Sequence, residues 1–432
     1  MVNTILGILL IVTFIGLIIY CMKGGNLLVG FLVTAILWCI IAQVPMQTVV
    51  TTVFEKSVEA YGSTIAVIIF GAWFGRVIVD TGIADYIIKK AVELGGDKPL
   101  VVALLLNIVC ALIFTSVFGV GSVMAIGMIV LPILFAIGID KKTAVGAYML
   151  SVAAGMYLNI AYVSQFFGVF QGVTYSDKYI HFAIYATIVQ VVVMVLFLVF
   201  HYLRSQKGGK VRAWAAPNTD AAAAAPKKSL SWYCILIPFI PIILVAFFKW
   251  QPVPSFLAGI ILGLLLTGNL SSYKGAIDKL QKTLYKGVSD CGLLIGMLYS
   301  VVIFQAAAKE AAPILKEMLG GIIPKDPFTL VIAFCILAPL ALFRGPLMIW
   351  GSGIALLSIL QSMGTFTTPF LFALFVVAPV AIVASSCPTQ SWGMWALSYA
   401  KLEPKEYLKT NFPWAWIIFV INELLAYFML AV

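Results

Sequence analysis

Residues 384–393 read Ala384-Ser385-Ser386-Cys387-Pro388-Thr389-Gln390-Ser391-Trp392-Gly393 and interrupt an apolar segment that covers about 369–398. The segment is long enough to span a bilayer, yet its middle is polar and contains a proline. Pro388 has no N–H and cannot continue a helix, so nearby backbone groups need other partners. Irregular backbone at membrane depth is tolerated where it is buried in protein or lines a cavity. The stretch therefore predicts a lined site inside a membrane protein.

A second interruption, Asn159-Ile160-Ala161-Tyr162-Val163-Ser164-Gln165-Phe166-Phe167-Gly168, lies in the apolar segment 143–172. Its Ser164-Gln165-x-x-Gly168 matches Thr389-Gln390-x-x-Gly393, which lies 225 positions later. Paired interruptions at corresponding positions of two halves are the best sequence pointer to the binding site of a transporter. We therefore expect both breaks to line one site.

The composition restricts the class of protein. Of 432 residues, 62% are hydrophobic and only 10% are charged, and the mean hydropathy is +1.08. These values predict an all-α polytopic membrane protein. We attribute the net charge of +10 to loops that face the cytoplasm and anionic lipids, not to a nucleic-acid partner. The seven scattered cysteines and two histidines predict no metal site, and no cofactor is expected.

The order of apolar runs predicts two repeats, each with three scaffold helices, a re-entrant hairpin, a broken helix and a closing helix. We expect the first repeat over 1–203, with scaffold 1–95 and transport elements 99–203. A basic linker follows at 204–230, and the second repeat covers 231–432, with scaffold 231–323 and transport elements 327–432. The first hairpin breaks at 115–122, and the second at 343–346 and 351–353. In the second scaffold we expect separate segments at 271–284, 287–305 and 309–323.

Short residue matches support the repeat. Pro99 aligns with Pro327, and Gly121-Ser122 aligns with Gly351-Ser352. If each half has five spans and one hairpin that returns to its own side, the halves are inverted. The bias of Lys and Arg then predicts a multi-pass protein of the cell (inner) membrane, with both termini outside and the linker cytoplasmic.

This order of elements in two inverted repeats resembles the ion transporter superfamily, which includes gluconate permeases and citrate and C4-dicarboxylate transporters. The segment Phe70-Gly71-Ala72-Trp73-Phe74-Gly75-Arg76, leading to Asp80-Thr81-Gly82, is similar to the segment before the first hairpin of gluconate-type permeases. Where the dicarboxylate symporters carry a Ser-Asn-Thr signature, this chain has Thr115-Ser116 and Arg344-Gly345-Pro346. The resemblance implies an elevator mechanism, in which hairpins and broken helices move against the scaffold of a homodimer.

Arg344 is the one charged residue in the segments 99–139, 143–172 and 328–400. A guanidinium at the bilayer centre costs at least about 2.5–3.5 kcal/mol on insertion scales, so a counter-charge is expected. We favour a substrate carboxylate, for which the planar fork of arginine is suited. The alternatives are a structural pair with Asp80 or Glu310, or a side chain that extends to the outer surface.

The polar residues of the breaks and hairpins supply the other candidates, because hydroxyls, amides and free carbonyls bind polyhydroxy acids or bare cations. We predict substrate binding by Arg344, Gly345, Ser116, Gly119, Asn159, Gln165, Ser352, Ser386, Thr389 and Gln390. We predict cation binding by Thr115, Gly121, Ser122, Ser164, Gly351 and Ser385.

Asp80 ends the third span, four residues after Arg76 on the same helical face. We favour an interfacial salt bridge between these two residues near the cytoplasm. The alternative makes Asp80 a proton carrier.

The leading hypothesis is a secondary transporter that takes up a small organic anion, a carboxylate or sugar acid, together with H+ or Na+. The alternative is a Na+/H+ antiporter, which needs a carboxylate at the midplane, and the broken elements contain none. An enzyme is not expected, because no paired carboxylates, catalytic triad, HExxH or phosphate loop is found.

Overall fold

A computed structural model describes residues 2–23, 25–170, 172–207, 230–319, 321 and 323–431. Every regular element in these ranges is a helix. The first half contains α1 (Val2–Met22), α2 (Leu27–Ile41), α3 (Met46–Thr48), η1 (Val49–Lys56), α4 (Ser57–Ala60), α5 (Gly62–Asp80), α6 (Ile83–Gly95), α7 (Pro99–Phe114), α8 (Val120–Ala136), α9 (Lys141–Met156), α10 (Ile160–Phe167) and α11 (Asp177–Lys207). Most of the predicted linker, including Lys210, Arg212, Lys227 and Lys228, lies outside the described residues.

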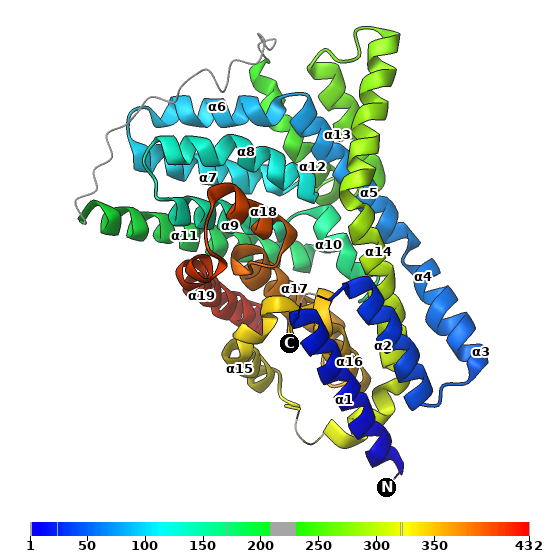
Figure 1. Cartoon of the computed structure of the whole chain (residues 1–432). Coiled ribbons are helices and arrows are strands. Elements are labelled where there is room, and N and C mark those ends of the chain that lie inside the picture. The colour runs from blue at the N-terminus through cyan, green and yellow to red at the C-terminus, as the bar shows by residue number, and fades with distance from the viewer. Residues whose placement is uncertain are drawn as a thin grey trace.

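The second half of the chain is coloured from green to red in Figure 1. It contains η3 (Trp232–Phe239), α12 (Ile240–Ala246), α13 (Pro252–Leu266), α14 (Tyr273–Leu319), α15 (Pro327–Leu337), η4 (Ala338–Arg344), η5 (Ile349–Gly353), α16 (Ile354–Met363), α17 (Thr368–Val377), η6 (Ala378–Ala384), α18 (Ser391–Ala400) and α19 (Pro404–Leu430). α7 and α15 each begin with a proline, Pro99 and Pro327, which suits the first helical position because its N–H would be unpaired there anyway.

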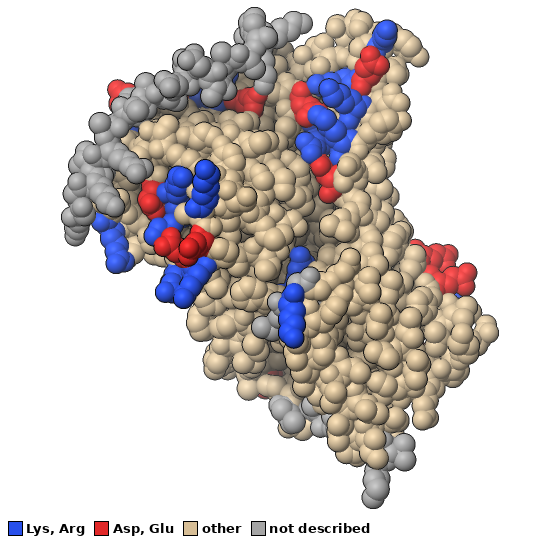
Figure 2. Space-filling view, in the orientation of Figure 1, with Lys and Arg blue, Asp and Glu red and all other residues tan. Residues whose placement is uncertain are grey.

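The described residues include six helices long and apolar enough to cross a membrane, or seven if the bent pair α9 and α10 is one span. Figure 2 shows charged atoms gathered in a few clusters, which leave most of this face of the molecule uncharged. Many large apolar side chains are exposed, among them Ile40 and Ile336, as expected for a surface that contacts lipid. The prediction of an all-α polytopic membrane protein is confirmed.

The chain reverses at residues 115–119 between α7 and α8. Both helices pack against α9, and both also contact α6. Gly119 lies at φ +109°, a conformation that glycine adopts freely. The break after α9 is shorter than predicted, because α9 ends at Met156 and α10 begins at Ile160, with a bend of 62°. Ser164 and Gln165 therefore lie inside α10, beyond the break.

The corresponding break of the second half lies at 387–390, between η6 and α18. Asn159 precedes α10 as its N-cap, and Gln390 precedes α18 in the same position. These two residues hold the same position relative to the helix that follows each break. The sequence match of Ser164-Gln165 to Thr389-Gln390 joins residues at different positions, because the first pair lies inside α10 and the second pair precedes α18.

The second half is more continuous between residues 273 and 319 than predicted. The segments expected at 271–284, 287–305 and 309–323 join into α14, whose 47 residues extend for about 70 Å at 1.5 Å per residue. Figure 1 shows α14 as the long helix that runs beside α2 and α5. In the first half a helical run that begins at Met46 leads into α5, whereas the predicted span begins only at about residue 63. A change from apolar to polar residues alters what a helix face contacts but does not end the helix.

Candidate functional site

Asn159 joins the first break to the tip of the first hairpin. Its Nδ2 donates to the carbonyl oxygens of Phe114, at 2.8 Å, and Val117, at 2.9 Å. Its Oδ1 accepts from the backbone N–H of Tyr162 at 3.0 Å and so caps α10. α9 also approaches the hairpin closely, since a Cβ on Gly155 would lie 2.5 Å from the carbonyl carbon of Phe114. The first hairpin and the first broken helix therefore form one connected unit.

The tip of the second hairpin has an unusual backbone. Phe343 and Arg344 are consecutive residues with φ of +53° and +66°, although neither is glycine. Non-glycine residues in this region are uncommon, and such positions cluster at binding sites. The N–H of Phe343 lies 3.5 Å from Sγ of Cys387 in the second break. The second hairpin therefore meets the second broken helix as the first hairpin meets the first.

Arg344 is half-buried at this strained tip. Its Nη1 lies 3.5 Å from the carbonyl oxygen of Trp350 and 3.9 Å from Sδ of Met297 on α14, both long contacts. The carbonyl of Arg344 accepts from Oγ of Ser352 at 3.3 Å. A Cβ on Gly351 would lie 2.2 Å from the same carbonyl, so only glycine fits there. The hairpin thus fixes the backbone from which the guanidinium extends.

Several predicted site residues have buried polar atoms without a hydrogen-bond partner among the described residues. They are Oγ of Ser116, Ser122 and Ser164, Nε2 of Gln165 and Oε1 of Gln390. A buried polar group without a partner costs about 1–3 kcal/mol, so each needs an explanation. A bound polar ligand or ion is one explanation, because it would supply the missing partners.

Other predicted site residues have protein partners. Oγ1 of Thr115 donates to the carbonyl of Leu112, and Oγ of Ser386 donates to that of Ile382. Oγ of Ser385 donates to the carbonyl of Val380 and accepts from Nε2 of Gln190 on α11. Thr389 Oγ1 lies 3.1 Å from Sγ of Cys387. The contacts of Thr115, Ser385 and Ser386 are mostly internal to helices, so these hydroxyls also serve packing.

One contact between the two halves joins α10 to the second hairpin. The rings of Phe166 and Trp350 lie 4.9 Å apart, edge to face. A separate cavity of about 410 Å³ has a lining that includes Val169, Lys309 and Gln361. No residue predicted to bind substrate or cation lines this cavity.

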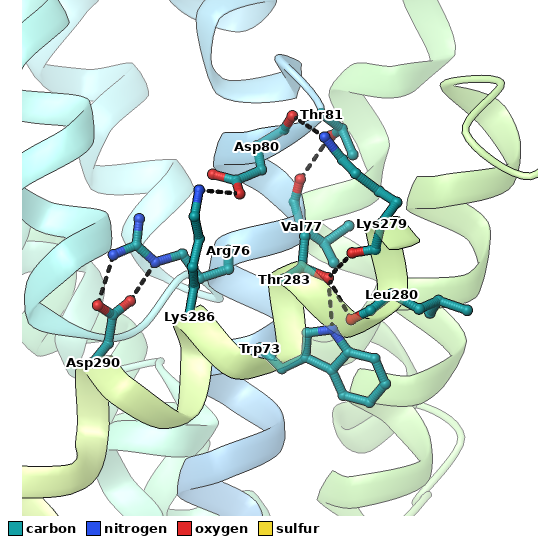
Figure 3. Close-up of polar contacts among 10 residues, drawn as sticks. All are labelled: Trp73, Arg76, Val77, Asp80, Thr81, Lys279, Leu280, Thr283, Lys286 and Asp290. Carbon is teal, nitrogen blue, oxygen red and sulfur yellow. Dashed lines mark hydrogen bonds and ion pairs between the residues drawn. The ribbon is translucent and has the colours of Figure 1, made fainter. Parts of the chain in front are cut away.

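A charged network connects α5 and α14 (Figure 3). Arg76 forms a bidentate pair with Asp290, with Nη2 of Arg76 2.6 Å from Oδ1 of Asp290. Asp80 accepts from Nζ of Lys286 at 2.7 Å, and its carbonyl oxygen accepts from Nζ of Lys279. The predicted salt bridge between Arg76 and Asp80 is therefore wrong, because α14 supplies a closer partner to each.

The first hairpin lies directly against this network. A Cβ on Gly121 would lie 2.0 Å from Nη2 of Arg76 and 2.3 Å from Oδ1 of Asp290. A Cβ on Gly75 would lie 2.7 Å from the carbonyl oxygen of Phe118. Glycine at these two positions lets the hairpin tip approach α5 and the ion pair without a side chain between them.

Sequence reasoning missed two acidic residues inside helices apolar enough to cross a membrane, Asp290 and Glu423. Each stands alone among apolar residues, in the expected spans 287–305 and 412–431 respectively. The rule that singled out Arg344, that an ionisable residue inside an apolar span has a function or a partner, would have found both. Asp290 has a partner, Arg76, whereas both oxygens of Glu423 have none among the described residues.

Comparison with solved structures shows a protein of similar fold. The sequence matches no protein-family model and no curated protein. Among solved structures, the chain is similar to the YdaH transporter of Alcanivorax borkumensis, whose crystal structure is described as revealing an unusual topology. The TM-score is 0.59 over 93% of this chain and 98% of that chain, at 13% sequence identity. The chain is thus a polytopic membrane protein that shares its fold with a transporter.

Proposed function

We propose that this protein is a secondary transporter that takes up a small organic anion, a carboxylate or sugar acid, together with H+ or Na+. The observation that carries the proposal is the strained tip of the second hairpin, where Arg344 has a φ of +66°. Such a conformation costs of order 1–3 kcal/mol and persists only when the surroundings enforce it. The strain positions a guanidinium, whose fork binds a carboxylate with two hydrogen bonds.

The unpaired polar atoms support an oxygen-rich ligand. Nε2 of Gln165 is a donor, Oε1 of Gln390 is an acceptor, and the hydroxyl of Ser116 can act as either. A polyhydroxy acid presents both kinds of group. A bare cation binds only acceptor oxygens, which fits the predicted role of Ser122 and Ser164.

We further propose an elevator movement in a homodimer, as in the resembling superfamily. In support, hydrogen bonds of Asn159 join the first hairpin to its broken helix, whereas ion pairs join α5 to α14. The hairpin touches α5 and α14 in part at Gly75 and Gly121. Neither glycine has a side chain that could form a hydrogen bond across this contact. A set of elements can slide along such a surface more readily than across ion pairs.

A Na+/H+ antiporter is the second candidate, and Glu423 is the observation that favours it. An antiporter exchanges protons for cations at a carboxylate inside the membrane. The broken elements contain none, but α19 carries Glu423, which is fully buried. Asp80 as a proton carrier stays a prediction, and its ion pair with Lys286 gives it a structural role.

The test is uptake of labelled gluconate, succinate and citrate into proteoliposomes under an imposed pH or Na+ gradient. We expect uptake of at least one probe by the wild type and its loss in Arg344→Gln. Lys178→Gln, which removes an exposed positive charge at the start of α11, is the matched control and should transport normally. Full uptake by Arg344→Gln would overturn the assignment, and exchange of Na+ for H+ without any organic anion would favour the antiporter.

A further inference from the structure

The carboxyl group of Glu423 is enclosed in the protein, on a helix apolar enough to cross a membrane. Glu423 is 0% exposed, and neither Oε1 nor Oε2 has a hydrogen-bond partner among the described residues. It is the one charged residue between Thr410 and Leu430 on α19. Its neighbours on the same face of the helix, Phe419 and Ala426, are also fully buried. An ionisable residue inside an apolar membrane helix costs free energy, so its presence indicates a function.

The elements packed around Glu423 bring no positive charge to it within the described part of the chain. α19 packs against α9, α11, α15, α17 and η6. The titratable groups near the carboxyl group are Tyr157 at the end of α9 and Cys335 on α15. Tyr179 on α11 donates to the carbonyl oxygen of Tyr157, and Tyr427 follows one turn further along α19. α17 and η6 carry no titratable side chain.

These surroundings decide the protonation state of the carboxyl group. Phenols and thiols are neutral at physiological pH, so none of them balances a negative charge. An isolated carboxylate in an apolar interior is far more costly than a neutral carboxylic acid. In the state described here Glu423 is therefore protonated, and only a rearrangement that opens α19 to water would let it ionise.

α19 also forms hydrogen bonds beside both breaks. Nδ2 of Asn422 donates to the hydroxyl of Tyr157 at 2.9 Å, and Tyr157 lies two residues before Asn159 in the first break. At the other end of α19, Tyr407 Oη and Asn411 Nδ2 both donate to the carbonyl oxygen of Ser385, just before the second break. A rearrangement of the breaks therefore changes the contacts of α19 directly.

We propose that Glu423 is the proton-binding group that couples transport to H+, an inference that rests on the proposed function. The carboxylate takes a proton from the solution on one side of the membrane, forming an O–H bond, and holds it while enclosed. The proton returns to water when the carboxyl group is opened to the other side. The inference makes H+ the coupling ion, where the sequence left H+ and Na+ open.

The first test needs no substrate. Infrared absorption of purified protein reports the carbonyl stretch of protonated carboxyl groups as pH is raised. We expect a band that persists above the pH at which exposed carboxyls ionise and that is absent from Glu423→Gln. The matched control is Glu403→Gln, which alters an exposed glutamate at the start of the same helix and should keep the band. A band unchanged in Glu423→Gln would overturn the inference.

The second test separates this inference from the proposed function. In proteoliposomes with labelled gluconate, succinate and citrate, Glu423→Gln should lose accumulation driven by a pH gradient, because its amide cannot release a proton. It should keep the exchange of internal for external probe, which needs no net proton movement. Accumulation driven by Na+ alone in the wild type would overturn the inference and leave the proposed function intact, whereas no transport of any probe would count against the proposed function.

Folding of the variant can be checked independently. Glutamine matches glutamate in shape and has no charge, so Glu423→Gln should elute as the wild type does in size exclusion. If it does not, Glu423→Asp, which keeps the carboxyl group, replaces it. We then expect proton-driven accumulation that shifts in its pH dependence while exchange persists. An unshifted pH dependence in Glu423→Asp would contradict the inference.

Discussion

Removing one partner of the Arg76–Asp290 pair should destabilise the protein far more than removing one partner of a surface pair. Side-chain exposure is 16% for Arg76 and 13% for Asp290, and the contact is bidentate. In Arg76→Met the carboxylate of Asp290 stays mostly buried but loses its counter-charge. Breaking a buried pair in this way typically costs about 3–5 kcal/mol.

Two comparisons isolate the electrostatic part. The double variant Arg76→Met/Asp290→Leu leaves no uncompensated charge, so its cost should be smaller than that of Arg76→Met alone. The surface control is Lys90→Met, which breaks the pair with Glu93, where exposures are 46% and 62%. Exposed pairs contribute about 0–1 kcal/mol, so this control should change little.

The assay is unfolding of purified protein in mixed micelles by a denaturing detergent, followed by loss of helical circular dichroism. The free energy of unfolding of each variant, relative to the wild type, gives a double-mutant cycle. Equal losses for Arg76→Met and Lys90→Met would refute the reasoning. A double variant whose loss equals the summed losses of Arg76→Met alone and Asp290→Leu alone would also refute it, because the losses at independent sites add.

Three further outcomes follow from the geometry and can be measured by thermal unfolding. Gly121→Ala should cost about 1–3 kcal/mol, because its Cβ would lie 2.0 Å from the guanidinium of Arg76. Gly292→Ala, whose Cβ would have no atom within 4 Å, should stabilise α14 by up to about 1 kcal/mol. Asn159→Ala should cost about 2–3 kcal/mol, because it removes one helix cap and two further hydrogen bonds. The control Asn26→Ala should cost about 0.5 kcal/mol, because it removes one long cap contact of 3.4 Å. Equal losses would contradict the contact of Asn159 with the first hairpin. Arg344→Gly should keep or raise the unfolding midpoint, because a φ of +66° suits glycine, and a large fall would contradict the strain.

The interrupted elements were predictable because the signal is local. Pro388 and the hydroxyls around it stand in an otherwise apolar segment, and the helix ends where the polar run begins. Pro99 and Pro327 likewise mark the starts of α7 and α15. Helix breaks depend on residues within one or two turns, so the sequence alone contains the information.

Partners across the fold were not predictable in the same way. The spacing of Arg76 and Asp80 favours a pair within one helix, but α14 brings Asp290 and Lys286 closer. That outcome depends on how α5 and α14 pack, over 200 positions apart in the chain. The sequence match pairs Gln165 with Gln390 in the same way, although Gln390 is the N-cap of α18 and Gln165 lies inside α10, whose N-cap is Asn159.

Whether Arg344 binds an organic anion is tested most directly by ligand-induced stabilisation of the purified protein. A ligand at a hundred times its dissociation constant stabilises the folded state by about 2.7 kcal/mol, which a thermal scan detects. With gluconate, succinate and citrate as probes, we predict that at least one raises the unfolding midpoint of the wild type and of Lys178→Gln but not of Arg344→Gln. An equal rise in Arg344→Gln would contradict the account.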